Sequence, residues 1–101
     1  MGFFTEARHG SGVVVSVTGE LDIATAPLLH RRLCELLCLP IDSLTVNLAG
    51  VTFMDSTGLA VLVRLLPEAD DRDVPFALAS VPHCVQRVLE VTDTDGLFDI
   101  R

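Results

Sequence analysis

The sequence has no lysine, tryptophan or tyrosine in its 101 residues, and its seven basic residues are all arginines. Fourteen carboxylates outnumber these arginines, so the formal charge at pH 7 is −7. Proteins that bind nucleic acids or anionic membranes need the opposite balance, because neutralised phosphates contribute much of their affinity. The absence of lysine also excludes a Gly-x-x-x-x-Gly-Lys nucleotide loop. The composition therefore predicts no nucleic-acid partner and no membrane partner.

Long apolar runs are missing as well. No run reaches the roughly 18 residues that a membrane span requires. Residues 1–10 show neither the basic start nor the apolar stretch of a secretory signal. We therefore expect a cytoplasmic protein, and its length predicts a single domain over residues 1–101.

Cysteine is scarce, and its count is odd: Cys34, Cys38 and Cys84. In a small chain without a signal peptide this favours reduced thiols over disulfides. Cys34 and Cys38 lie four residues apart on a predicted helix and could present two thiolates on one side. A zinc site needs about four ligands, however, and no second His or Cys pair has matching spacing. No metal and no cofactor is predicted.

Alternating polar and apolar residues, together with Gly and Pro turn signals, predict five strands. We expect the second strand to end at Gly19. The predicted strands are residues 3–8, 12–18, 43–48, 75–80 and 97–100.

Three helices are predicted between these strands. The first begins at Thr25, which is expected to cap it, and ends before Pro40. The second spans about 56–66, because Pro67 and the acidic residues 68–73 indicate a loop. The third opens at Ser80 and Pro82.

The resulting order, β-β-α-β-α-β-α-β, predicts an α/β fold with a mixed, mainly parallel sheet of four to five strands. Buried central strands of a doubly wound fold are apolar on both faces. The strands at 13–18 and 43–48 each have a polar face. We therefore expect the helices to pack mainly on one face of the sheet.

The most informative segment is residues 53–59, FMDSTGL, which follows a strand and opens a helix. Asp55 and Ser56 are both good N-cap residues, and one interpretation is that they only cap the helix. The alternative is that Ser56 presents its hydroxyl near the positive end of the helix dipole, where a phosphoryl group could be held. Asp55 would then repel that phosphoryl group.

A third interpretation makes Ser56 a hydrolase nucleophile. The Gly-x-Ser-x-Gly pattern of such enzymes is not met, because Met54 occupies the first glycine position. No spacing links Ser56 to any of the three histidines, so a catalytic base is not indicated. The sequence therefore favours a protein that is not an enzyme.

Two further features point to a binding surface. The loop at 19–25 follows the carboxyl end of a strand, as Ser56 does, and this is the usual binding edge of a parallel sheet. Asp22 in this loop is either a solvated turn residue or a charged contact near Ser56. The predicted second helix is apolar nearly all round, which is consistent with ordinary packing or with a protein-binding patch.

These segments together closely resemble the bacterial STAS-domain family of anti-sigma factor antagonists. The resemblance covers about residues 12–100. Its most specific elements are GELD at 19–22 and DSTGL at 55–59. Further matches lie at residues 46–48, 85–89 and 96–98.

The resemblance implies a phosphorylation switch. In the family, an anti-sigma factor that is a serine kinase of the histidine-kinase-like ATPase type phosphorylates the serine after the motif aspartate, which here is Ser56. The unphosphorylated antagonist binds the anti-sigma factor and releases a sigma factor. Phosphorylation ends this binding and a serine phosphatase restores it. The partner-binding residues implied here are Asp22, Ile23, Thr25, Met54, Asp55, Thr57, Gly58 and Leu59.

The family also includes scaffold or regulatory subunits, for example in transporter-associated complexes, and this remains the alternative. The Asp55–Ser56 pair favours the switch. We expect a monomer or a weak homodimer.

Overall fold

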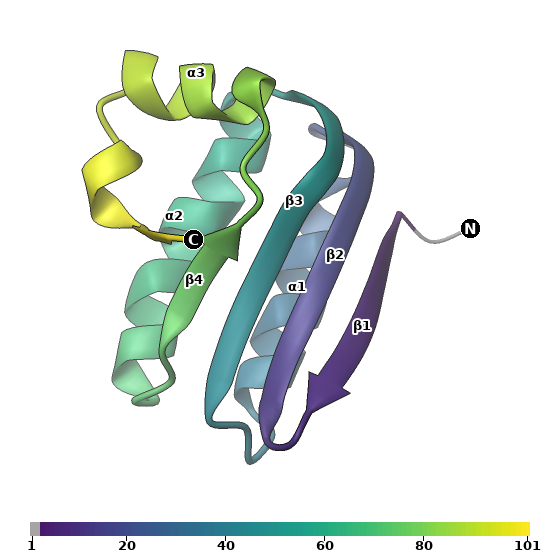
Figure 1. Cartoon of the computed structure of the whole chain (residues 1–101), viewed down its shortest axis with the longest axis vertical. Helices are drawn as coiled ribbons and strands as arrows, with labels where there is room; N and C mark the ends of the chain where they lie inside the picture. Colours follow the sequence, from purple (N-terminus) through teal and green to yellow (C-terminus); the bar gives the residue numbers. More distant parts are fainter. Residues whose placement is uncertain (1–2) are drawn as a thin grey trace.

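The protein is a five-stranded sheet packed against helices, as a computed structural model that describes residues 3–101 shows (Figure 1). The strands lie in chain order across the sheet; β1 is antiparallel to β2, and the other neighbours are parallel. Residues 1–2 of the predicted domain lie outside the described residues. The elements are β1 (Phe4–His9), β2 (Gly12–Leu21), α1 (Ala26–Leu37), β3 (Ser43–Met54), α2 (Ser56–Asp71), β4 (Phe76–Ala79), α3 (His83–Val91), the 3-10 turn η1 (Asp95–Leu97) and β5 (Asp99–Ile100).

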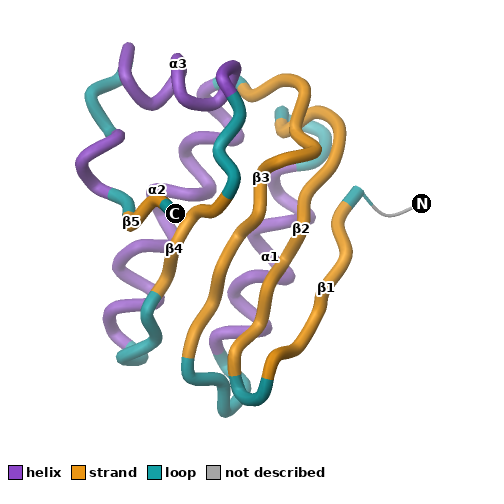
Figure 2. The backbone as a smooth tube through the Cα atoms, viewed as in Figure 1, coloured by secondary structure: helices purple, strands orange, loops and turns teal. Residues whose placement is uncertain are grey.

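The predicted fold class and element order are confirmed, and so is the one-sided arrangement. Helices α1 and α2 lie behind the sheet in Figure 1, while α3 crosses beyond the end of β4. Alternate residues of β2 and β3 point toward the helices and are fully buried. The polar residues between them, such as Ser16 and Asn47, lie on the opposite face, which no helix within residues 3–101 covers (Figure 2).

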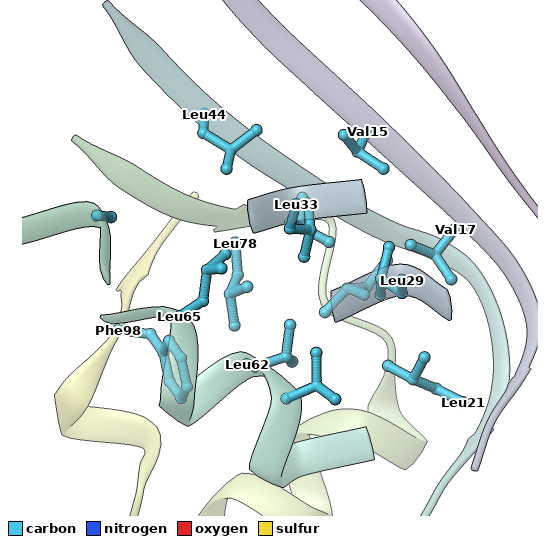
Figure 3. Close-up of a cluster of buried hydrophobic side chains, with 14 of the residues drawn as sticks. Val15, Val17, Leu21, Leu29, Leu33, Leu44, Leu62, Leu65, Leu78 and Phe98 are labelled. Carbon is cyan, nitrogen blue, oxygen red and sulfur yellow. The ribbon is translucent and has the colours of Figure 1, made fainter. Parts of the chain in front are cut away.

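Leucine and valine side chains fill the space between the sheet and the helices (Figure 3). Leu29 and Leu33 of α1 meet Leu62 of α2 there, and none of the three is measurably exposed. Each such side chain contributes roughly 1.5–3 kcal/mol on burial. This core fixes α1 and α2 under the sheet, and with them the loops at the carboxyl ends of β2 and β3.

The prediction that Gly19 ends the second strand is wrong. Gly19 adopts a φ of 83°, which glycine tolerates, and the strand continues to Leu21. Leu21 is fully buried and pairs with Met54 of β3, so core packing carries the strand past the glycine.

The predicted end of the second helix at Pro67 is also wrong. Helix α2 contains Pro67 and runs to Asp71, so most of the predicted acidic loop is helical. Proline removes one helical hydrogen bond and usually breaks a helix. Here Ala69 is buried in the last turn and its carbonyl accepts from Arg72 and Val74, which holds the helix together beyond the proline.

Two smaller expectations need correction. Thr25 occupies the N-cap position of α1, but its side chain makes no capping hydrogen bond. Residues 97–100 are not all strand, because η1 extends to Leu97 and only Asp99–Ile100 pair with β4. The other predicted strands and helices agree with the structure to within a few residues, except that β3 continues to Met54.

An ion pair ties the edge strand β1 to helix α1. Arg32 donates to both carboxylate oxygens of Glu6, with Nη2 at 2.8 Å from Oε1, and also to Glu35. This pairing lowers the pKa of Glu6, and partial desolvation opposes the shift less strongly. Ionised Glu6 therefore stabilises the fold at neutral pH.

We predict that Glu6→Gln destabilises the protein more at pH 7 than at pH 3. With a lowered folded pKa, the ionised carboxylate contributes stability above the unfolded value of about 4.3, and this is lost as pH falls through the folded value. Urea unfolding at both pH values measures the difference. Glu90→Gln, an exposed change on α3 away from Arg32, is the matched control. Equal destabilisation by Glu6→Gln at pH 7 and pH 3 would contradict the assignment.

Candidate functional site

Two loops meet where the parallel strands β2 and β3 end. Leu21 pairs with Met54, and the amide of Asp55 donates to the carbonyl of Leu21 across 3.3 Å. The chain leaves β2 into the loop 22–25 and leaves β3 directly into α2. The predicted loop residues and Ser56 are therefore brought to one edge of the sheet.

Irregular pairing in β3 shapes this edge. Gly19 pairs with Val51 but Glu20 pairs with Phe53, so Thr52 is an extra residue on β3. Such a bulge shifts the alternation of side chains. Thr52 and Phe53 consequently both point outward, and 47% of Phe53 is exposed, between the buried Val51 and Met54.

Asp55 caps helix α2, and Ser56 does not. The Oδ1 atom of Asp55 accepts from the amides of Thr57 at 2.9 Å and Gly58 at 3.2 Å. Ser56 is the first helical residue, and its side chain is exposed and has no hydrogen-bond partner among the described residues. Of the two capping candidates, Asp55 therefore caps the helix, and Ser56 keeps its hydroxyl free.

We predict that Asp55→Ala lowers the free energy of unfolding by about 1 kcal/mol, the usual cost of losing an N-cap. Asp55→Asn should restore most of this loss, because an amide oxygen can accept the same two hydrogen bonds. Chemical denaturation of the three proteins measures both effects. The capping role would be contradicted if Asp55→Ala were as stable as the wild type.

The electrostatics of the helix start are set by the Asp55 carboxylate. An anion at a helix N-terminus is normally stabilised by free amides and the helix dipole. Two of the first amides already bind Asp55. A phosphoryl group on Ser56 would therefore face a carboxylate in the position that an anion prefers, and it would project from the surface.

The loop 22–25 is held together by Asp22 and Thr25. The Asp22 carboxylate accepts from the amides of Ala24 and Thr25, and the Thr25 hydroxyl donates to the carbonyl of Glu20 across 2.7 Å. Both side chains are half-buried. The loop is thus rigidly built, and it presents Ile23, which is 77% exposed.

Gly58 sets the distance between α2 and this loop. A Cβ atom at Gly58 would lie 2.5 Å from the carbonyl oxygen of Leu21 and 3.1 Å from Cγ of Met54. Met54, Gly58 and Leu59 are all buried, whereas Thr57 is half-buried. Met54, Gly58 and Leu59 were predicted to bind the partner, but they lie beneath the surface and determine where the exposed residues sit.

Sequence reasoning did not single out two exposed apolar residues. Phe53 belongs to the recognised motif segment, but it lies beyond the predicted strand at 43–48 and was therefore assigned no face. Leu28, in the first turn of α1, is more than half exposed. Continuing the alternation of the predicted strand as far as Met54 would have placed Phe53 outward, because the two extra residues of β3 in its pairing with β2 restore the original alternation.

A second polar cluster lies between α1 and α2. Sγ of Cys34 is 3.6 Å from Nε2 of His30, and Nη2 of Arg64 is 3.5 Å from Nδ1. Burial and then the Arg64 charge lower the pKa of His30, while burial and the Glu68 carboxylate raise the pKa of the Cys34 thiol. Both groups therefore favour their neutral forms at neutral pH.

Residues 3–101 enclose no pocket and bring no three potential metal ligands together. The three cysteines in the described part of the chain are free thiols. None of the helices described is long and apolar enough to cross a membrane. An outward-facing surface with Ile23, Phe53 and Ser56 suits a protein partner better than a small molecule.

Comparison with known proteins gives consistent matches. A family model described as "Mlab, STAS domain" matches residues 4–99. An anti-sigma-B factor antagonist from Staphylococcus epidermidis is 32% identical over 92 residues, which cover 91% of this chain and 85% of that protein.

Solved structures agree with these matches. The crystal structure of an anti-sigma factor antagonist from Mycobacterium paratuberculosis has a TM-score of 0.86 and 26% identity, covering 96% of this chain and 82% of its own. The anti-sigma factor antagonist SpoIIAA, in its unphosphorylated form, shares the fold with a TM-score of 0.82 and 17% identity, covering 97% and 87%. The names of these relatives all describe anti-sigma factor antagonists.

Proposed function

Because the chain belongs to the STAS-domain family, we propose that it is an anti-sigma factor antagonist switched by phosphorylation of Ser56. The observation that carries the proposal is the free, exposed hydroxyl of Ser56 at the start of α2, beside a carboxylate that already caps the helix. The description of the 32% identical relative as an anti-sigma-B factor antagonist supports the same assignment.

In the unphosphorylated state, the surface formed by Ile23, Phe53 and Ser56 binds the anti-sigma factor, and a sigma factor is released. The surface combines two exposed apolar side chains with a small neutral hydroxyl. Apolar anchors surrounded by polar groups are typical of the centre of a protein interface. Asp22 and Thr25 keep the loop in shape, and Asp55 and Thr57 border the hydroxyl.

Phosphorylation then ends the complex. A phosphoryl group adds about −1.5 to −2 charge at pH 7. The capping contacts of Asp55 leave little room for this charge to settle on the helix amides. It therefore stays at the surface, where a binding partner would have to desolvate it next to another carboxylate.

The switch requires two activities that this chain does not provide. The anti-sigma factor, as a serine kinase of the histidine-kinase-like ATPase type, transfers the phosphoryl group, and a serine phosphatase removes it. The protein itself acts by binding and not by catalysis, in the cytoplasm where sigma factors work. The hydrolase interpretation has no support at Ser56, because within residues 3–101 no histidine makes a hydrogen bond with its hydroxyl, and His30 contacts Cys34 and Arg64.

We predict that Ile23→Asp weakens binding to the anti-sigma factor at least about tenfold, because a charge would be buried in an apolar contact. Stability should change little, since the side chain is 77% exposed. Val91→Asp is the matched control: Val91 is 82% exposed at the last residue of α3. Calorimetric titration with the anti-sigma factor measures both variants. Equal effects of the two substitutions would place the contact elsewhere.

The scaffold interpretation makes a different prediction about the partner. Partners are captured from cell lysate on the immobilised, unphosphorylated chain and identified by mass spectrometry. This experiment distinguishes the switch from the scaffold. The proposed function predicts an ATPase of the serine-kinase type whose retention is lost for Ile23→Asp. Retention of transporter subunits in its place, with no kinase, would overturn the switch in favour of a scaffold.

A further inference from the structure

The outer edge of β1 is an unpaired strand edge. Six residues of β1 pair with β2 on one side only, and the strand forms the outermost edge of the sheet in Figure 1 and Figure 2. All of them except Phe4 are exposed. The opposite edge, β5, has only two residues. Exposed edges of this length can pair with another strand unless proline, a bulge or charged side chains prevent it. β1 contains no proline and no bulge, and its charged residues Glu6 and Arg8 restrict the registers in which it can pair.

The hydrogen-bond pattern shows which residues face outward. The amide of Thr18 donates to the carbonyl of Phe3 across 2.7 Å, so these two form a hydrogen-bonded pair. Hydrogen-bonded and non-hydrogen-bonded pairs alternate along an antiparallel ladder. Thr5, Ala7 and His9 therefore bond toward β2. The amides and carbonyls of Glu6 and Arg8 are directed away from β2, toward the open edge.

Charge selects one register for a second copy of this strand. Outward-bonding residues must pair with each other, which allows Glu6 opposite Glu6, Arg8 opposite Arg8, or Glu6 opposite Arg8, besides registers in which Phe4 faces itself or Glu6 and no opposite charges meet. Opposite charges across a strand pair stabilise it, and like charges destabilise it. Only the third register, with its two-fold axis at Ala7, places opposite charges at both positions.

We propose that two copies of this chain associate through antiparallel pairing of β1, with Ala7 at the two-fold axis. Glu6 of each copy faces Arg8 of the other, and Arg32 continues to bind Glu6 from α1 below. Such an interface is self-complementary and closes as a dimer, whereas pairing of β1 with β5 would build an open chain of copies. Ala7, with its small side chain, occupies the close-contact position on the axis.

The geometry predicts a weak dimer with two free partner surfaces. A single strand pair is a small interface, and the charge of −7 on each copy opposes association. Antiparallel pairing also reverses the second copy. The carboxyl ends of β2 and β3, with Ser56, therefore point in opposite directions and remain accessible. Dimerisation is expected to be independent of the state of Ser56.

Disulfide trapping tests the register. In a chain carrying Cys34→Ala, Cys38→Ser and Cys84→Ala, an added Ala7→Cys places two thiols at a position where Cα atoms lie about 4.5 Å apart, within disulfide reach. Thr5→Cys is the matched control on the same face. Its thiols would be about four residues out of register, roughly 13 Å apart.

We expect a mild oxidant to give covalent dimers with Ala7→Cys and few with Thr5→Cys. Adding Arg8→Glu to Ala7→Cys should reduce the covalent fraction about tenfold, because both opposed pairs become like-charged. Circular dichroism checks that each variant is folded. A covalent yield for Ala7→Cys no higher than that for Thr5→Cys, or one unaffected by Arg8→Glu, overturns the proposal. Ser56→Asp should leave the yield unchanged, so this result stands apart from the phosphorylation switch.

Discussion

Replacing Ser56 by aspartate should weaken binding to the anti-sigma factor by about 30-fold or more. Ser56 is exposed beside Asp55, whose carboxylate already accepts the amides of Thr57 and Gly58. A second carboxylate cannot share those amides and must remain at the interface. Burying it beside a like charge costs about 2 kcal/mol or more, which corresponds to this loss of affinity.

The matched control is Ser56→Ala, which removes the hydroxyl without adding charge. It should bind the anti-sigma factor nearly as well as the wild type and should not be released when ATP is added. Helix stability should change little in Ser56→Asp, because attraction to the helix dipole is opposed by repulsion from Asp55. Calorimetric titration measures the affinities and urea unfolding the stability. If the folded Ser56→Asp variant bound the anti-sigma factor with wild-type affinity, charge at this position would not be the basis of the switch.

Replacing Gly58 by alanine should destabilise the protein by about 1–2 kcal/mol. The added Cβ would lie 2.5 Å from the backbone oxygen of Leu21, so α2 must move away from the end of β2. Overpacking of this kind costs roughly 1–3 kcal/mol. The better helix propensity of alanine offsets part of that cost. The melting temperature should fall by about 5 °C or more.

Gly96→Ala is the control for this effect. A Cβ at Gly96 would meet nothing within 4 Å, so its thermal unfolding should match that of the wild type. Gly58→Ala should also weaken partner binding, because the shift separates Ser56 from the loop that presents Ile23. Differential scanning calorimetry compares the two variants. A melting temperature for Gly58→Ala at or above the wild-type value would show that the close approach is not required.

Much of the fold could be predicted, because the apolar residues recur at the spacing of a helix face in the helices and at every second position in the strands. The spacing of the leucines in α1 and the alternation in β2 and β3 predict the face that packs in the core, and these side chains are buried. The errors occurred where tertiary packing overrides a local signal. Gly19 and Pro67 are both usual breakers, but buried neighbours, Leu21 and Ala69, carry the strand and the helix past them.

Part of the local geometry of the candidate site was left open by the sequence. Asp55 and Ser56 were both capping candidates, and the structure shows Asp55 as the cap and the Ser56 side chain exposed. Phe53 was missed as a surface residue because the predicted strand stops at residue 48. The continuation of β3 to Met54 includes two register shifts against β2, and these are a property of two strands together.

Mapping the phosphorylated residue tests the central claim most directly. The purified chain is incubated with its captured anti-sigma factor and ATP, and the phosphopeptides are sequenced by mass spectrometry. The account predicts one phosphoryl group, on Ser56, and none in Ser56→Ala. Phosphate on Thr57 or elsewhere, with Ser56 unmodified, would contradict it.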